Sequence, residues 1–198
     1  MDELTLRYTY AAFFIIFIII SSVYRIKATK KGGDAFDVMK KEGISVAIPL
    51  RLVGFSLTIG SLIFIFYPSA LAFANLREYN WFFTAGIILC IISFPFIIWT
   101  FQSLGKNITE TVETRKSNEL VTTGIYKYLR HPIYTTTFFY NCGLAFIAAN
   151  WLIGTIAIAL FVLLIIRTSN EEKILIEKYG DDYRNYMERT GGHFPKLF

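Results

Sequence analysis

Long apolar runs separated by short polar segments dominate the pattern of this chain. Three runs, Leu4–Tyr24, Ile44–Tyr67 and Trp81–Phe101, are each long enough to cross a bilayer as a helix, which takes about 20 residues. A fourth run, Ile133–Arg167, is interrupted by AANW at Ala148–Trp151, where a polar Asn and a Trp suited to the membrane interface favour a turn. We therefore predict an all-α, polytopic membrane protein with five transmembrane helices, the last two forming a tight helical hairpin.

The composition supports a membrane protein. Hydrophobic residues make up 54% of the 198 positions and aromatic residues 17%, whereas a typical soluble domain is about 45–50% apolar. The first span begins with MDE rather than with a basic segment. We therefore expect this span to be retained and not removed as a signal peptide.

The basic residues predict how the spans are oriented. Cytoplasmic segments near helix ends are enriched in Lys and Arg, and 18 of the 20 basic residues lie in segments 25–51, 106–130 and 167–196. The other two, Arg7 and Arg77, lie in the alternating segments. The N-terminus is therefore predicted outside and the C-terminus in the cytoplasm. The net charge of +5 favours contact with anionic membrane lipids, and the chain carries no nucleic-acid-binding motif.

Metal, redox and common nucleotide sites have no support in the motifs. Cys90 and Cys142 lie in apolar runs without a CxxC or Cys/His spacing, so we expect small packing residues and no metal. Neither GxGxxG nor GxxxxGK[ST] is present, which removes the Rossmann and P-loop modes of nucleotide binding. Any chemistry must therefore lie in the cytoplasmic polar segments.

The segment ELVTTGIYKYLRHPIY, Glu119–Tyr134, is the densest of these polar segments. Gly124 favours a turn and Pro132 suits the first position of a helix, so Arg130 and His131 should lie just before a helix N-terminus. Free backbone N–H groups and the helix dipole attract an anion there. The alternative is a plain membrane anchor within an aromatic belt, whose rings would be Tyr126, Tyr128 and Tyr134.

The segment RTSNEEKILIEKYGDDYRNY, Arg167–Tyr186, follows the last span and should be helical until Gly180. Arg167 and Glu171 are four residues apart and can share one helical face. Glu172 has a structural alternative, because Ser169 and Glu172 match the S-x-x-E pattern of a capping box. A face of large side chains should cover the membrane or the preceding loop: Leu175, Tyr179, Tyr183 and Tyr186.

A tight hairpin would bring these segments to the same cytoplasmic edge of one helix pair. Two basic groups, a histidine and two carboxylates would then converge at the membrane surface. Such a pocket suits a zwitterion, with a carboxylate near Arg130 or the helix N-terminus and an ammonium or hydroxyl groups near Glu171.

The sequence LVTTGIYKYLRHPIY, a two-helix segment and then R…EEKILIEKYGDDYRNYM resembles the C-terminal half of isoprenylcysteine carboxyl methyltransferases and their small prokaryotic integral-membrane relatives. The resemblance covers roughly Phe101–Phe198, including SLGKN and the closing FPK. It implies a methyltransferase that uses S-adenosylmethionine in a pocket unlike the Rossmann fold. Residues 101–198 would be the catalytic half, with C-terminal helices in the cytoplasm, integrated in one domain with the N-terminal spans of residues 1–100.

The resemblance also implies roles for individual residues. The loop before the fourth span and the glutamate pair after the last one would bind the cofactor, through Leu120, Val121, Gly124, Tyr126, Arg130, His131, Tyr134 and Glu171. Arg167 and Glu172 are the expected catalytic residues, with Arg167 facing the substrate and Glu172 or His131 serving as a base where the acceptor loses a proton. The chain departs from the family pattern at Asn118, where many relatives have His, and at Ile108, where an aromatic residue is usual.

The expected acceptor is a lipophilic small molecule or a prenylated group that enters from the bilayer; its identity and the oligomeric state stay open. One alternative is an NADPH-dependent membrane sterol or isoprenoid reductase with similar motifs, although Ile133 stands where its pattern has Asn. A non-catalytic membrane scaffold is another, but it gives no reason to gather charged residues at one edge. The charged residues in question are Arg130, His131, Arg167 and Glu171.

Overall fold

The computed structural model of the chain describes residues 2–29, 43–76, 81–105 and 119–196. Within these residues all named secondary structure is helical. The elements are α1 (Glu3–Thr29), α3 (Ile44–Phe66), η1 (Pro68–Ala74), α4 (Trp81–Leu104), η3 (Gly124–Lys127), α5 (Pro132–Ala148), α6 (Trp151–Tyr179) and α7 (Asp181–Arg189). The predicted all-α fold is confirmed for this part of the chain.

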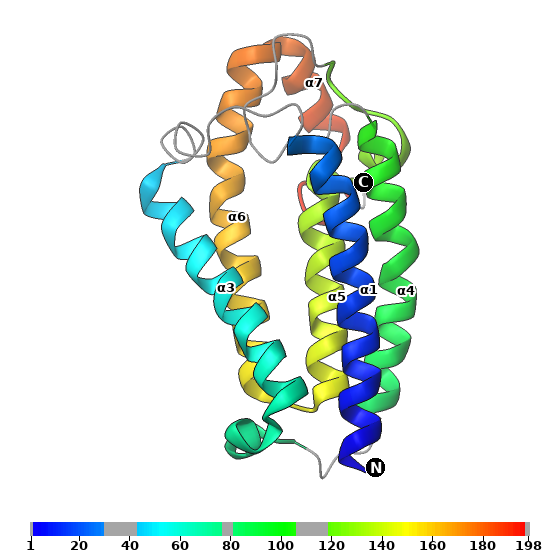
Figure 1. Cartoon of the computed structure of the whole chain (residues 1–198). Helices are drawn as coiled ribbons and strands as arrows, with labels where there is room; N and C mark the ends of the chain where they lie inside the picture. Colours follow the sequence, from blue (N-terminus) through cyan, green and yellow to red (C-terminus); the bar gives the residue numbers. More distant parts are fainter. Residues whose placement is uncertain (1, 30–42, 77–80, 106–118, 197–198) are drawn as a thin grey trace.

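The long helices form a bundle around α5 (Figure 1). Helices α1 and α4 pack against α5, and α3 packs against α6. Ten of the 17 residues of α5 are buried, which makes it the central helix. The core joins large side chains from several helices, including Tyr10, Phe64 and Tyr140, each fully buried.

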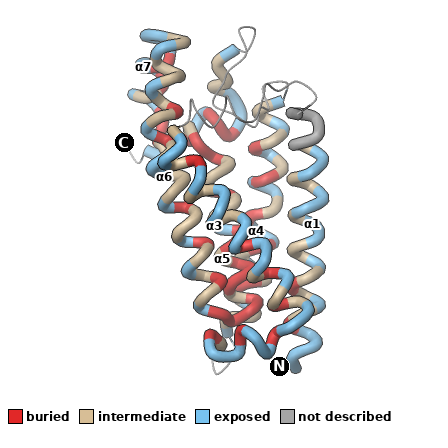
Figure 2. The backbone as a smooth tube through the Cα atoms, turned by 60° about the vertical axis from the view of Figure 1, so that its left-hand side comes forward, coloured by how far each residue is buried: buried red, intermediate tan, exposed pale blue. Residues whose placement is uncertain are grey.

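Four helices of the described chain are long and apolar enough to cross a membrane by length and composition: α1 over Glu3–Tyr24, α3, α4 and α6. Apolar side chains are exposed along these helices, and Figure 2 shows the buried positions gathered toward the bundle interior. Lipid accommodates such a surface and water does not, so the chain is built as an integral membrane protein. Four of the five predicted spans therefore meet the criterion of length and composition. The fifth, α5, has 17 residues, spans about 25 Å and is too short to meet it.

Helices α4 and α5 approach each other at two glycines. A Cβ atom on Gly86 would lie 2.6 Å from the backbone nitrogen of Ile147 and 2.7 Å from the carbonyl oxygen of Gly143. A Cβ atom on Gly143 would lie 2.6 Å from Cys90 Sγ. Both positions therefore require glycine, and small residues of this kind let membrane helices pack backbone to backbone. Cys90 is fully buried at this crossing, in agreement with its predicted packing role.

Two residues, Ala149 and Asn150, separate α5 from α6, and the two helices run in opposite directions from this turn (Figure 1). Ala149 has the left-handed φ of 44°. Asn150 is the N-cap of α6: its Oδ1 accepts from the N–H of Ile153 at 3.2 Å, and its Nδ2 donates to the carbonyl oxygen of Leu71 at 3.1 Å. The polar residue in AANW is thus buried as a helix cap.

At the opposite end of the bundle, Gly180 ends α6 with a φ of 57°, as predicted. Helix α7 turns back from this point, and the following chain pairs with the loop before α5 through a parallel bridge between Leu129 and Gly191. Tyr183 and Tyr186 of α7 are buried there. Tyr186 covers the preceding loop, since its hydroxyl donates to the carbonyl oxygen of Tyr126, and this was one of the two predicted roles of the face.

Candidate functional site

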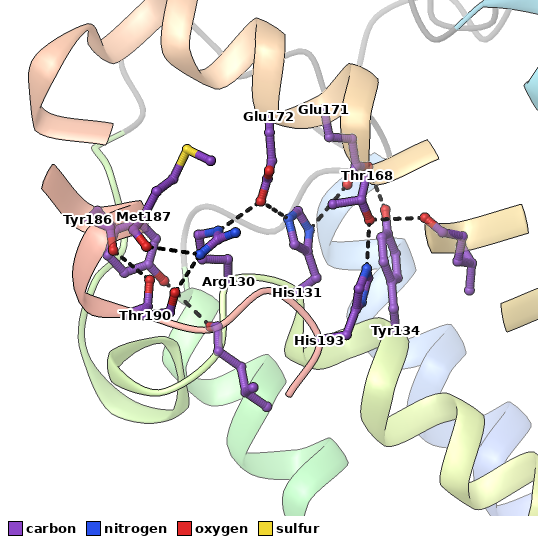
Figure 3. Close-up of polar contacts among 12 residues, drawn as sticks. Arg130, His131, Tyr134, Thr168, Glu171, Glu172, Tyr186, Met187, Thr190 and His193 are labelled. Carbon is purple, nitrogen blue, oxygen red and sulfur yellow. Dashed lines mark hydrogen bonds and ion pairs between the residues drawn. The ribbon is translucent and has the colours of Figure 1, made fainter. Parts of the chain in front are cut away.

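Charged and aromatic side chains meet where the end of α6, the loop before α5 and the chain after α7 come together (Figure 3). This group, termed the polar cluster, consists of Arg130, His131, Tyr134, Arg167, Glu171 and Glu172. His131 and Glu171 are each only 8% exposed. Charges removed from water in this way are stable only when they are paired.

The path of the loop depends on a glycine and a proline. Gly124 has a φ of 60°, and a Cβ atom there would lie 2.2 Å from Ser103 Oγ, so only glycine lets the loop approach α4 this closely. Ser103 Oγ accepts a hydrogen bond from the backbone N–H of Ile125 at 3.3 Å. Pro132 is the first residue of α5 and His131 is its N-cap. The prediction that His131 directly precedes a helix is therefore confirmed.

Helix α6 continues without a break through both glutamates. The capping-box interpretation of Ser169 and Glu172 is wrong, because no helix begins at Ser169. Glu172 instead contacts two residues of the loop before α5. Its Oε1 lies 2.8 Å from Arg130 Nε and 3.1 Å from His131 Nε2.

His131 lies between the two carboxylates. Its Nδ1 is 3.4 Å from Glu171 Oε2, and its Nε2 is 3.1 Å from Glu172 Oε1. Burial by itself lowers the pKa of His131, but the hydrogen bonds and negative charges of Glu171 and Glu172 outweigh it, so the pKa is raised above its ordinary value. The two carboxylates thus favour the protonated form of the imidazole that lies between them.

Arg167 and Tyr134 meet at the other carboxylate. Arg167 and Glu171 share one face of α6, as the spacing predicted, and Arg167 Nε lies 3.2 Å from Glu171 Oε1. The Tyr134 hydroxyl donates to the same oxygen. The guanidinium carbon of Arg167 is 6.0 Å from the centre of the Tyr134 ring. Glu171 thus joins residues of α5 and α6.

Arg130 ties the loop to the chain after α7. Its Nη1 donates to the carbonyl oxygens of Met187, at 3.3 Å, and Thr190. Close by, the Tyr186 hydroxyl donates to the carbonyl oxygen of Tyr126 at 2.6 Å. Arg130 therefore has a structural part in the site, whatever it binds.

The other predicted cofactor residues precede the polar cluster in the loop: Leu120, Val121, Gly124 and Tyr126. The first two are half-buried, Gly124 packs on α4, and Tyr126 is buried. These four residues lie earlier in the loop than Arg130, whereas the six cluster residues contact one another directly. The departures from the family pattern at Ile108 and Asn118 lie outside the described residues.

His193 was not predicted and lies against the polar cluster. The centre of its ring is 5.4 Å from that of His131 and 6.2 Å from that of Tyr134. Its Nε2 is 3.1 Å from Thr168 Oγ1, another residue that was not predicted. The available signal was weak: His193 is the second of only two histidines and follows a pair of glycines.

The arrangement suits a small ligand that carries both signs of charge. The carboxylates of Glu171 and Glu172 attract a cation, and the guanidinium groups of Arg130 and Arg167 attract an anion. The stacked rings of His131 and Tyr134 add aromatic faces, with an interplanar angle of 13°. Over the described ranges, no three His, Cys, Asp or Glu side chains form a group that could hold a metal ion.

The fold and the cluster define an integral membrane protein with a group of paired charges at one end of its helix bundle. Residues 81–182, just over half of the chain, match the model of the family described as phospholipid methyltransferase. The chain belongs to this family. The matched segment runs from α4 to the start of α7 and includes the loop before α5, so it contains all six residues of the polar cluster.

Curated relatives confirm the resemblance noted from the motifs. The protein-S-isoprenylcysteine O-methyltransferase of Tribolium castaneum is 29% identical over 133 residues, which cover 66% of this chain and 47% of the relative. The protein of the same name from Dictyostelium discoideum is 34% identical over 100 residues, or 48% of this chain and 42% of the relative. The chain thus spans about half the length of the curated relatives it matches.

A solved structure of similar fold is that of the eukaryotic intramembrane Ras methyltransferase ICMT (isoprenylcysteine carboxyl methyltransferase). The two superimpose with a TM-score of 0.54 and 20% sequence identity. The match covers 83% of this chain and 55% of the other. At this identity, the similarity concerns the fold.

Proposed function

We propose that this protein is a methyltransferase that acts at the membrane on a lipophilic acceptor and takes the methyl group from S-adenosylmethionine. The polar cluster is the observation that carries the proposal, because segments from three parts of the chain hold its charges against one another at one end of an apolar bundle. Anchoring side chains reach the head groups separately and have no need of such pairing. The family and the names of the relatives supply the reaction class.

The residues present fit this methyl donor. S-adenosylmethionine carries an ammonium, a carboxylate, a sulfonium cation and a flat adenine ring. Buried Glu171 offers a negative charge, Arg130 a positive one, and His131 and Tyr134 aromatic faces that attract cations and stack on flat rings. We assign to the donor the residues Leu120, Val121, Gly124, Tyr126, Arg130, His131, Tyr134 and Glu171.

When bound, S-adenosylmethionine supplies an activated methyl carbon, so the protein needs no covalent nucleophile. The task of the protein is alignment, where orientation can contribute roughly 7–11 kcal/mol in ideal cases. Glu171 and His131 would hold the donor side. Arg167, one helical turn before Glu171, would orient the reacting group of the acceptor.

The chemistry of the acceptor decides whether the reaction needs a general base. A carboxylate, as on a prenylated cysteine, needs no base and would accept a bidentate contact from Arg167. An amine or hydroxyl head loses a proton, which Glu172 or His131 would take up. In both cases the acceptor would reach the site from the bilayer, while the polar donor would arrive from the cytoplasm.

The proposal includes a topology of five spans with the N-terminus outside and the polar cluster on the cytoplasmic side. It rests on the placement of 18 of the 20 basic residues. Helix α5 would cross with α6 as a hairpin, since a helix about 25 Å long fits where the bilayer thins locally. Residues 101–198 would form the catalytic half, integrated with the first half because α4 packs on α5.

Labelling of single cysteines in sealed, right-side-out vesicles tests the topology. We expect Glu3→Cys to react with an impermeant maleimide from outside and Lys196→Cys to react only after permeabilisation. The reverse result would overturn the orientation.

Ligand titration separates the proposal from the reductase alternative. S-adenosylhomocysteine, the demethylated donor, should bind the purified protein, and NADPH should not. Transfer of a labelled methyl group to a panel of prenylated cysteine peptides and phospholipids then identifies the acceptor. Binding of NADPH in place of S-adenosylhomocysteine would refute the proposed function.

A further inference from the structure

The chain after α7 is held against the loop before α5 by backbone hydrogen bonds. The N–H of Arg130 donates to the carbonyl oxygen of Gly191 at 2.9 Å, and the N–H of Gly191 donates to that of Tyr128 at 3.2 Å. A Cβ atom on Gly191 would lie 1.7 Å from the carbonyl oxygen of Phe194, so the turn that follows requires glycine. This turn fixes the direction of the side chain inside it, His193.

His193 is held at both its backbone and its ring. Its carbonyl oxygen accepts from Thr135 Oγ1 at 2.7 Å, and its Nε2 lies 3.1 Å from Thr168 Oγ1. The ring centre is 5.4 Å from that of His131 and 5.7 Å from that of Phe161. His193 thus lies between the polar cluster and the apolar side chains of α6. Figure 3 shows the His193 ring beside Thr168 and the cluster.

The hydrogen-bond network assigns the tautomer of this ring. The Thr168 hydroxyl has one proton and donates it to the carbonyl oxygen of Leu164 at 3.0 Å. This arrangement satisfies both the Leu164 carbonyl and the Thr168 oxygen when His193 Nε2 donates to Thr168, and Nδ1 of the neutral ring then carries a lone pair. Nδ1 is buried and has no hydrogen-bond partner among the residues that the structure describes. A buried acceptor without a hydrogen bond destabilises the folded protein, so it indicates a partner supplied by a ligand.

The charges around His193 favour its neutral form. Burial and the cation at His131 lower the pKa of His193, and Arg130 acts in the same direction. Glu171 and Glu172 act in the opposite direction but do not reverse the shift. The lone pair on Nδ1 is therefore available near neutral pH.

We propose that His193 is a further binding residue of this site, and that its Nδ1 accepts a hydrogen bond from an N–H or O–H group of the bound methyl donor. The inference rests on the proposed function. The donor, and not the acceptor, is the partner because the His193 ring lies beside those of His131 and Tyr134, both assigned to the donor. S-adenosylmethionine offers hydroxyl and amino groups that can fill this role.

Two substitutions separate the two ring nitrogens. Gln places its amide where Nε2 lies, so His193→Gln keeps a donor for Thr168 and removes Nδ1. Asn places its amide near the position of Nδ1, so His193→Asn keeps an acceptor there. In titrations of the full chain we expect His193→Gln to weaken S-adenosylhomocysteine affinity about five- to tenfold, and His193→Asn to weaken it less. Equal affinity in His193→Gln and the unaltered protein would overturn the inference.

The ring nitrogens of the unaltered protein provide a test that needs no substitution. With only two histidines in the chain, ¹⁵N imidazole spectra can be assigned directly, and we expect them to show His131 protonated on both nitrogens and His193 on Nε2 alone. We expect addition of S-adenosylhomocysteine to shift the Nδ1 signal of His193 in the direction of a hydrogen-bonded acceptor. A proton found on Nδ1, or an Nδ1 signal that does not move while S-adenosylhomocysteine binds, would overturn the inference.

These outcomes differ from a failure of the proposed function. If the unaltered protein binds no S-adenosylhomocysteine, the methyltransferase assignment itself is refuted. If it binds and the His193 results are negative, only the role of His193 is lost. Thermal unfolding of both variants checks that the chain after α7 remains folded.

Discussion

The α4–α5 crossing and the polar cluster are both tightly packed, but different forces hold them. At the crossing, Gly86 and Gly143 let two backbones come into contact, and the atoms nearest to both glycines belong to Ile147, Cys90 and the glycines themselves. In the cluster, His131 and Glu171 are almost as well buried, yet each depends on charged partners from another element. The crossing is stable because glycine has no side chain to keep the helices apart, and the polar cluster is stable because its charges are paired.

This difference predicts how each region responds to substitution. An added methyl group at the crossing has nowhere to go, because the atoms it meets belong to the backbone. Removal of a cluster charge brings no atoms into collision but unbalances the remaining charges, which the proposed methyl donor would also use. Substitutions at the crossing should therefore act on folding, and those in the cluster on binding and turnover.

The largest effect is expected at the crossing. Gly86→Ala should lower the free energy of unfolding by about 3 kcal/mol or more, since its Cβ atom would lie 2.6 Å from the backbone nitrogen of Ile147. Gly60→Ala is the matched control, because a Cβ atom there meets nothing within 4 Å. Denaturant unfolding in detergent measures both. Similar stability of the two variants would show that α4 and α5 are not in such close contact.

Next in size is the effect of Arg167 on turnover. Arg167→Ala should reduce methyl transfer roughly a hundredfold, or about 3 kcal/mol, with a much smaller change in S-adenosylhomocysteine affinity. Arg167→Lys should recover little activity, because an ammonium lacks the bidentate fork. Arg184→Ala serves as the control, since the Arg184 side chain is 62% exposed. Full activity in Arg167→Lys would reduce Arg167 to an interfacial anchor.

Two cluster residues should affect binding of the donor. His131→Ala and Glu171→Gln should each weaken S-adenosylhomocysteine affinity by about 1–3 kcal/mol, the range for a lost buried polar contact. Glu177→Gln, at an exposed position of the same helix, is the control. Titration calorimetry on folded variants decides the matter. Unchanged affinity in both would leave these residues with a structural role only.

The smallest effect is the pH dependence of stability. Because the pKa of His131 is raised in the folded protein, its contribution is fully present below the ordinary histidine value of about 6.5 and is lost as pH rises through the folded pKa. The difference in Tm between the unaltered protein and His131→Gln should therefore shrink toward alkaline pH. His193→Gln should show the opposite slope, since the pKa of His193 is lowered and the unaltered ring costs stability as pH falls below about 6.5. A pH-independent difference for His131→Gln would contradict its pairing with the glutamates.

Local patterns in the sequence were enough for much of the fold. Apolar runs predicted α1, α3 and α4 closely, because a bilayer sets the minimum length of a spanning helix. Pro132, Gly180 and the spacing of Arg167 and Glu171 predicted a helix start, a helix end and a shared helical face, since each depends on backbone geometry within a few residues. The motif pattern also led to the correct family.

Only the tertiary structure decided what meets across the bundle. Ser169 and Glu172 fit a capping box by spacing, but the continuous α6 directs Glu172 to Arg130, 42 residues away in the chain. The position of His193 against the cluster and the contact of Gly86 with α5 were likewise invisible, because no local period relates residues so far apart. Helix and turn signals act over a few residues, whereas a buried charge selects its partner from whatever the packed helices bring within about 4 Å.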